Sequence, residues 1–123
     1  MGSKQELFEK TLSTMNQEGD FVAAMLSMKD GLPLASSPSQ YEDTMAAAMV
    51  TLLDETANKL NRELRLPQID EISIVGDDGT RLVCRYFNVD GHTIMLTVVT
   101  RPDQSYRRLT KQTIREIKRI WIS

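Results

Sequence analysis

The sequence has few of the residues on which catalytic and metal sites depend. Among its 123 residues there is one cysteine and one histidine. A single cysteine excludes a disulfide within the chain, which suits a reducing compartment such as the cytoplasm. No pair of cysteines or histidines stands at the spacing of a zinc site, and one histidine gives little support for acid–base chemistry. We therefore expect no metal, no cofactor and no enzymatic activity.

The cysteine and the histidine both have ordinary structural interpretations. Cys84 lies inside an expected strand, where a cysteine behaves as a small apolar residue. His92 follows Gly91 at an expected turn, where a solvated side chain is typical. A catalytic thiol would need an activating base, and these two residues meet only if their strands place them opposite each other. We favour the structural interpretation for both.

Phosphate loops and long apolar runs are absent as well. The sequence contains neither G-x-x-x-x-G-K-[ST] nor G-x-G-x-x-G, so the chain is not itself a P-loop GTPase or ATPase. No apolar run approaches the roughly 20 residues that span a bilayer, and the N-terminus lacks the apolar stretch of a signal peptide. We expect residues 1–123 to form one cytoplasmic domain, in which residues 1–3 are disordered, a remnant of an expression tag, or a native start.

The charge is nearly balanced but unevenly placed. The formal net charge is −2, which excludes the strongly basic composition typical of a dedicated nucleic-acid binder. From Arg101 to the end the chain carries seven basic and two acidic residues, so this segment is +5 and the remainder is −7. A solvated basic face on a last helix accounts for most of this asymmetry, which can also orient a partner.

Hydrophobic periodicity predicts a helix, two strands, a long helix, three strands and a last helix. The expected elements are a helix at 4–16, strands at 21–28 and 32–35, a helix at 41–65, strands at 69–75, 82–89 and 92–100, and a helix at 105–122. Residues 36–39 are expected to form a loop in which Ser39 caps the long helix. The charged residues of the last helix, from Arg107 to Arg119, are expected to face solvent.

The order of the strands follows from which of them are apolar on both faces. Residues 21–28 and 92–100 have this pattern, which is typical of central strands. Pro33 cannot donate to a ladder, so its strand belongs at an edge. Joining the two central strands predicts an α+β fold (an α/β sandwich) with a five-stranded antiparallel sheet in the order 2-1-5-4-3. The topology is αββαβββα with helices on both faces.

This order leaves the third strand, residues 69–75, as an exposed edge. An alternating edge strand with few charges is a liability unless it is paired. Pairing with a second copy would remove the edge and bring the long helices of two chains together, so we expect a symmetric homodimer. The predicted interface residues are Ala46, Val50, Ala57, Ile69, Ile72, Ser73 and Ile74.

The long helix carries two apolar stripes. The stronger one is expected to pack on the sheet and consists of Met45, Met49, Leu52, Leu53, Thr56, Leu60 and Leu64. The weaker one contains small residues that would let another helix approach, namely Ala46, Ala47, Val50 and Ala57. The alternative is that these alanines simply favour helix formation.

One segment of the sequence resembles a known family. Residues 21–36, F-V-A-A-M-L-S-M-K-D-G-L-P-L-A-S, resemble the opening hairpin of the roadblock/dynein light chain family, and D-G-L-P-L-A-S is similar to its prokaryotic, MglB-like members. The strand at 94–99 and the closing amphipathic helix also fit, so the resemblance covers about residues 4 to 122. It implies a roadblock-like fold, a homodimer built through the edge strand and the long helix, and Ras-like small GTPases as partners.

The resemblance also implies where a partner binds. In bacterial members the paired long helices face the GTPase, which by position implies Ala46, Ala47, Val50, Asp54 and Asn58. The partner-binding candidates beyond the dimer interface are therefore Ala47, Asp54 and Asn58. The chain ends soon after the last helix and places no arginine on a distinctive loop, so the resemblance leaves a GTPase-activating role open.

The leading functional interpretation is a non-enzymatic dimeric regulator or scaffold of a Ras-like small GTPase. The first alternative is a small-molecule sensor domain, which needs an apolar pocket with a few convergent polar groups. The polar residues available near the core for such a pocket are Cys84, Tyr86 and His92. The second alternative is a structural dimerisation subunit of a larger complex, which would pair without preferring a nucleotide state.

Overall fold

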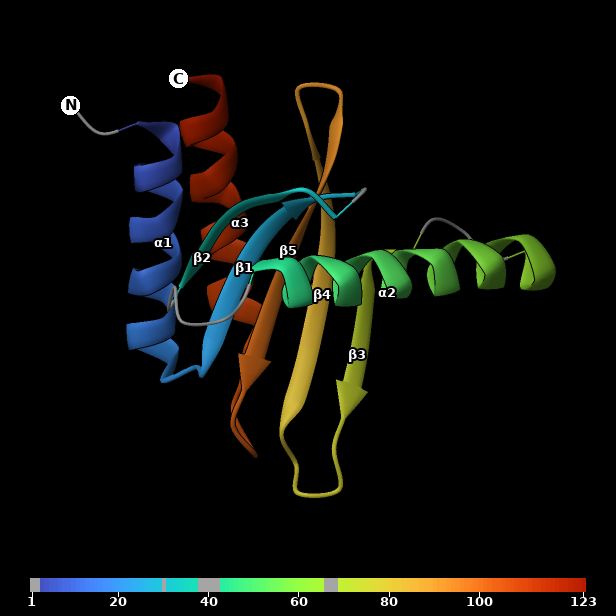
Figure 1. The fold of residues 1–123 in the computed structure, drawn as a ribbon. Helices are drawn as coiled ribbons and strands as arrows, with labels where there is room; N and C mark the ends of the chain where they lie inside the picture. Colours follow the sequence, from blue (N-terminus) through green and yellow to red (C-terminus); the bar gives the residue numbers. More distant parts are fainter. Residues whose placement is uncertain (1–2, 30, 38–42, 66–68) are drawn as a thin grey trace.

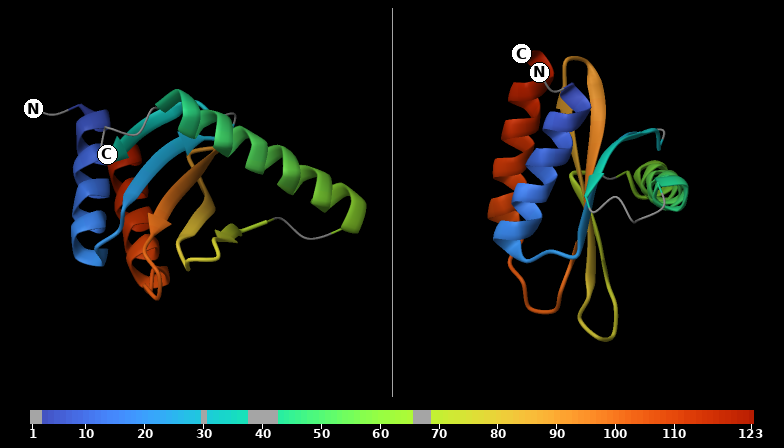
Figure 2. Two further views of the ribbon diagram at one scale, coloured as in Figure 1. Left: turned by 60° about the horizontal axis from the view of Figure 1, so that its bottom comes forward. Right: turned by 60° about the vertical axis from the view of Figure 1, so that its left-hand side comes forward.

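A computed structural model describes residues 3–29, 31–37, 43–65 and 69–123, with the backbone alone for residues 43–52. The fold has three layers (Figures 1 and 2). A sheet forms the middle layer, α1 (Lys4–Gly19) and α3 (Arg107–Ile122) cover one face, and α2 (Asp43–Leu64) crosses the other. The strands are β1 (Ala23–Met28), β2 (Pro33–Ser37), β3 (Glu71–Val75), β4 (Arg81–Val89) and β5 (His92–Thr100).

The sheet is antiparallel throughout, in the order β2-β1-β5-β4-β3, which confirms the predicted order and fold class. Central β5 joins the two hairpin systems, because Thr97 lies opposite Met25 on one side and Cys84 on the other. Five of the six residues of β1 and six of the nine residues of β5 are buried. The pattern of apolar residues on both faces was therefore sufficient to place them.

Tight turns fix the register of the hairpins. Between β4 and β5, Asp90 has φ 51° and Gly91 has φ 78°, a left-handed pair typical of two-residue hairpins. Between β3 and β4, Gly79 has φ 90° and donates its N–H to the carbonyl oxygen of Gly76 at 3.0 Å. Asp78 accepts the backbone N–H of Thr80 at 2.9 Å, which closes the same turn.

Several element boundaries differ from the prediction. β1, β3 and α3 each begin two residues later than predicted, whereas two other elements extend further at their C-terminal ends. The first helix continues past Asn16 to Gly19, because Gln17 and Glu18 are good helix formers that need no apolar contact, and it ends at Asp20 in the left-handed conformation. Residues 36–37 belong to β2 and not to a loop. Asn16 donates to the carbonyl oxygen of Ser37 at 2.9 Å, which ties the end of β2 to α1. The predicted cap Ser39 lies outside the described residues.

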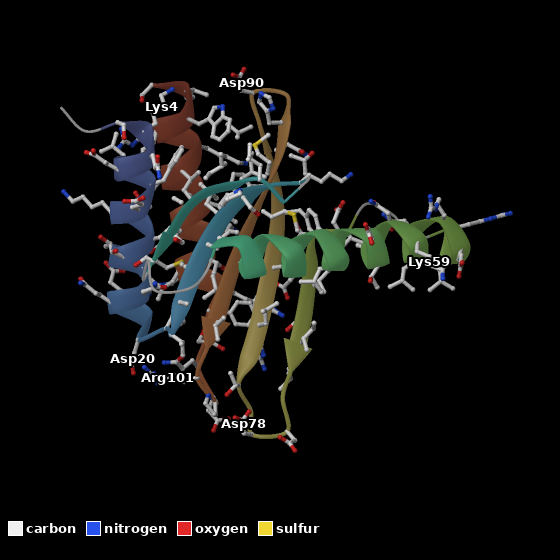
Figure 3. All side chains as sticks on the ribbon, viewed as in Figure 1. Lys4, Asp20, Lys59, Asp78, Asp90 and Arg101 are labelled. Atoms are coloured by element: carbon white, nitrogen blue, oxygen red, sulfur yellow. The ribbon has the colours of Figure 1, made fainter. Side chains whose placement is uncertain are left out.

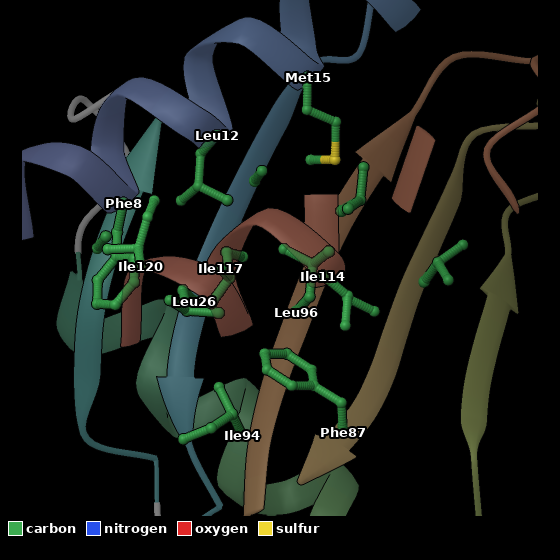
Figure 4. Close-up of a cluster of buried hydrophobic side chains, with 14 of the residues drawn as sticks. Phe8, Leu12, Met15, Leu26, Phe87, Ile94, Leu96, Ile114, Ile117 and Ile120 are labelled. Carbon is green, nitrogen blue, oxygen red and sulfur yellow. The ribbon is translucent and has the colours of Figure 1, made fainter. Parts of the chain in front are cut away.

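The main core lies between the sheet and the α1–α3 pair (Figure 4). It brings together Phe8, Leu12 and Met15 of α1, Ile114, Ile117 and Ile120 of α3, and Leu26, Phe87, Ile94 and Leu96 of the strands. The basic residues of α3 point away from this core and are exposed, as predicted.

On the other face of the sheet, the described side chains form a separate buried cluster. Met25, Cys84 and Met95 are buried there, and Leu53 of α2 packs against them with Ile72 and Tyr86 at the margin. None of the helices in the described part of the chain is long and apolar enough to cross a membrane.

Candidate functional site

Strand β3 is an open edge of the sheet. It pairs with β4 on one side, from Glu71 opposite Arg85 to Val75 opposite Arg81, and no strand of this chain lies on its other side in the described residues. Ile74 and Val75 are 52% and 55% exposed. An exposed edge with large apolar side chains is suited to pairing with another strand.

Helix α2 extends beyond this edge. Figure 1 shows its C-terminal half projecting past β3, and Figure 3 shows Lys59 on this projecting part. Leu60 is 42% exposed and Leu64 is 62% exposed. Thr56 is exposed as well. The prediction that these three residues pack on the sheet was wrong, because the sheet ends before the helix does. Leu53 alone among the described stripe residues packs against the core as predicted.

The predicted dimer residues differ in their exposure. Ala57 is only 3% exposed within a single chain. Ile69 and Ile72 are half-buried, whereas Ser73 and Ile74 are exposed. Ala46, Ala47 and Val50 carry side chains that lie outside the described part of the structure.

Asp54 and Asn58 turn toward the sheet and not away from it. Asn58 donates its side-chain amide to Asp54 Oδ2 at 3.3 Å, and the Tyr86 hydroxyl donates to Asp54 Oδ1 at 3.4 Å. These residues line a small polar cavity of about 60 Å³ between α2 and the sheet, together with Ala57 and Asn61. Both candidates are half-buried, so part of each side chain remains accessible to a partner.

Burial sets the protonation of the tyrosine in this cavity. Desolvation raises the pKa of Tyr86 well above its ordinary value, and nearby Cys84 and the Asp54 carboxylate raise it further. Its hydroxyl therefore remains a hydrogen-bond donor at any physiological pH. This donor holds the Asp54 carboxylate against β4, which fixes one point of α2 on the sheet.

The residues considered for a sensor pocket are not brought together. Cys84 is fully buried on the α2 face, where Thr97 donates to its sulfur at 3.6 Å. His92 lies at the other side of the sheet, with its ring 5.7 Å from that of Trp121 in α3. The two residues also have different strand partners, so the cysteine has no histidine base.

A charged network that sequence reasoning missed ties β3 to α3. Tyr106 donates its hydroxyl to Glu71 Oε2 at 2.9 Å, Arg85 Nε lies 3.7 Å from Glu71 Oε1, and Arg107 Nη2 lies 3.8 Å from Oε2. Arg81 and Arg107 each place a guanidinium 5.3 Å from the centre of the Tyr106 ring. One signal was available, because Arg85 interrupts an apolar strand. A charged residue at such a position needs a partner.

No group of three or more histidine, cysteine, aspartate or glutamate side chains in the described part of the chain is arranged to hold a metal ion. The candidate site is the surface formed by the open edge of β3 together with the projecting half of α2. Such a surface binds strands and helices by backbone pairing and apolar contact.

Comparison with known proteins relates this arrangement to solved structures. No protein-family model matches the sequence, and no curated protein matches it. The gliding protein MglB from Thermus thermophilus superposes with a TM-score of 0.75 at 17% identity, over 98% of this chain and 92% of that chain. An MglB with a tetrameric arrangement gives 0.75 at 18% identity, over 98% and 91%. A Roadblock/LC7 domain from Streptomyces avermitilis gives 0.68 at 16%, over 93% and 94%.

This chain has the roadblock fold. The agreement covers nearly the whole chain, which confirms the fold that the opening hairpin implied. At these identities the likeness concerns the arrangement of the backbone, and the roadblock fold by itself does not define an activity.

Proposed function

We propose that this roadblock-fold protein is a non-enzymatic, dimeric regulator or scaffold of a Ras-like small GTPase in the cytoplasm. The observation that carries the proposal is the open β3 edge beside a helix that projects past it. The resemblance to the roadblock/dynein light chain family supplies the class of partner. The fold shared with MglB proteins supports that assignment.

The dimer follows from the exposed apolar groups. Ile74 lies on the sheet face that α2 crosses, because it is two residues from Ile72, which packs near Leu53. Pairing of β3 with β3 of a second copy would continue the sheet across a two-fold axis. The projecting half of each α2 would then lie over the partner, and Leu60 and Leu64 would become buried. The tetrameric arrangement of one similar MglB supports self-association.

A substitution on the edge tests the dimer. Ile74→Lys places a charge on an exposed edge position, which opposes strand pairing without disturbing the core of one chain. We expect light scattering after size exclusion to change from a dimer to a monomer mass, with an unchanged circular dichroism spectrum. The matched control is Ile122→Lys, an exposed isoleucine at the end of α3. The dimer proposal fails if Ile74→Lys leaves the mass unchanged or if both variants reduce it.

A second experiment tests the partner. Affinity capture from a lysate of the source organism, with a GTP analogue or GDP present, identifies a candidate P-loop GTPase by mass spectrometry. The purified GTPase is then titrated in both nucleotide states. A regulator must bind one state more tightly, by at least about tenfold if it is to shift the population appreciably. Equal affinities would support the structural-subunit alternative, and capture of no GTPase would overturn the proposal.

A substitution at Asn58, which hydrogen-bonds to Asp54, tests whether α2 contacts the GTPase in this titration. If the accessible part of α2 contacts the GTPase, Asn58→Lys should weaken binding, whereas Glu18→Lys on α1 should not. Both substitutions introduce a lysine on a helix. A single-turnover hydrolysis assay with the captured GTPase then separates a scaffold from an activator.

A further inference from the structure

A second surface lies on the opposite side of the sheet from α2. A groove of about 470 Å³ runs between β4 and the side of α3 that faces away from α1. Its principal lining residues are Arg85, Phe87, Lys111, Ile114, Arg115 and Lys118. Ile69, one of the predicted dimer residues, and Asp70 line one end of the groove. Its other lining residues belong to β4 and α3, which the proposed dimer and GTPase contacts do not involve.

The rim of the groove is cationic. Lys111, Arg115 and Lys118 recur at the spacing of one helix face and are all exposed. Within the described part of the chain, none of these three side chains forms an ion pair; the ion pairs found there involve other basic residues. Asp70 is the one carboxylate among the lining residues. Four basic residues and one acidic residue line the groove, which therefore has an excess of positive charge.

Arg85 adds positive charge at the base of the groove. Its Nη1 donates to Thr110 Oγ1 at 2.9 Å, and its buried Nε lies 3.7 Å from the Glu71 carboxylate. These contacts hold the guanidinium in place beside the basic residues of α3, where its charge favours an incoming carboxylate.

The base of the groove is also apolar. Phe87 and Ile114 contribute to it, and the ammonium group of Lys118 lies 6.0 Å from the centre of the Phe87 ring. An anion without apolar groups would leave this part of the groove unfilled. The combination fits a short segment that carries several carboxylates and at least one apolar side chain.

We propose that this groove binds an acidic peptide segment of a partner protein. A peptide fits better than nucleic acid or a membrane because only this part of the molecule is basic. Outside the last 23 residues the chain carries −7, which would repel a polyanion longer than the groove. A short acidic segment occupies the groove without meeting that charge.

The probe for this proposal is a fluorescein-labelled peptide, Glu-Glu-Glu-Phe-Glu-Glu-Glu, titrated with the full chain in low salt and followed by anisotropy. The same peptide with glutamine in place of glutamate is the first control. We expect the double variant Lys111→Glu, Arg115→Glu to weaken binding at least about tenfold, because two attractive contacts become repulsive. Added salt should weaken wild-type binding in the same direction.

The matched control is a double variant that carries both Lys10→Glu and Arg108→Glu. It makes the same change in net charge at two exposed positions outside the groove, and it should alter affinity less than about twofold. Circular dichroism and thermal unfolding establish that each variant is folded. If the reversal variant does not fold, Lys111→Gln with Arg115→Gln replaces it.

Three outcomes would overturn the proposal. The first is no binding of the peptide at millimolar concentration. The second is an equal loss of peptide affinity in the groove variant and in the control variant, which indicates general charge attraction. The third is tighter, groove-dependent binding of a single-stranded oligonucleotide or of phosphatidylserine vesicles, which would assign the groove to nucleic acid or to a membrane surface.

Discussion

At the scale of single residues, Glu71 connects several elements through charged contacts. It receives the Tyr106 hydroxyl and lies near the guanidinium groups of Arg85 and Arg107. Because Glu71 stands at the start of β3, these contacts connect the open edge strand to α3. The edge is held in place by a network on the face opposite α2.

Removing this carboxylate should destabilise the fold. Glu71→Ala leaves Arg85 partly buried without its counter-charge, and we expect a loss of about 1–3 kcal/mol in the free energy of unfolding. Glu71→Gln should lose less, since an amide still accepts the Tyr106 hydroxyl. Urea unfolding measures both. Glu63→Ala, at an exposed position of α2, is the control, and an equal effect there would contradict the role of the network.

Cys84 gives a prediction about pH. Burial raises the pKa of its thiol to about 11, whereas an unfolded cysteine titrates near pH 9. Between these values the unfolded chain loses a proton that the folded chain retains, so stability falls as pH rises from about 9 to 11. The loss approaches about 2–3 kcal/mol at the upper end.

The measurement is urea unfolding at several pH values from about 8 to 11 for the wild type and for Cys84→Ala. The alanine variant is less stable throughout because it leaves a cavity, but it should lose less stability over this range. The difference between the two curves removes the contribution of other titrating groups. Parallel curves would contradict a buried, neutral thiol.

At the scale of elements, the described part of α2 is unevenly supported. Leu53 packs against a buried cluster on the sheet, whereas Leu60 and Leu64 in the projecting half are exposed. Helices shorter than about 12–15 residues are marginal alone, and longer ones in proteins still depend on packing. The projecting half of α2 has little such packing within one chain.

We therefore expect amide hydrogen exchange to be faster in residues 58–64 than in α3. If the proposed dimer forms, the rate should fall as protein concentration rises, because Leu60 and Leu64 would then be covered. Mass spectrometry of the wild type and of Ile74→Lys at equal concentration provides the comparison. Strong protection of this segment in the monomeric variant would show that the helix does not need a second copy.

The sequence predicted the elements and their order more reliably than their contacts. Strand order followed from which strands are apolar on both faces, a property of each strand alone. The environment of Leu60 and Leu64 depends on how far the sheet extends beneath α2, which no local pattern contains. The contact between Glu71 and Tyr106 joins residues 35 positions apart and depends on the docking of α3. The burial of Ala57 likewise depends on where α2 crosses the sheet.

At the scale of the whole molecule, stability and association should be linked. If the open edge pairs two chains, the folded state is favoured by mass action, and Tm rises with protein concentration. Differential scanning calorimetry over a roughly hundredfold range of concentration measures this. Ile74→Lys should have a Tm that does not vary with concentration. A constant Tm for the wild type together with a constant monomer mass would exclude the dimer.

The central position of β5 has a consequence for how the chain folds. The opening hairpin pairs with β5 and not with any strand between them, so residues as far apart as Ala23 and Val99 lie opposite each other. During synthesis the first half of the protein cannot complete its sheet until residues 92–100 have left the ribosome. Contacts so distant in sequence slow folding, and the opening hairpin stays without its partner strand in the meantime. Until then the nascent chain exposes apolar strands that later pair within the sheet.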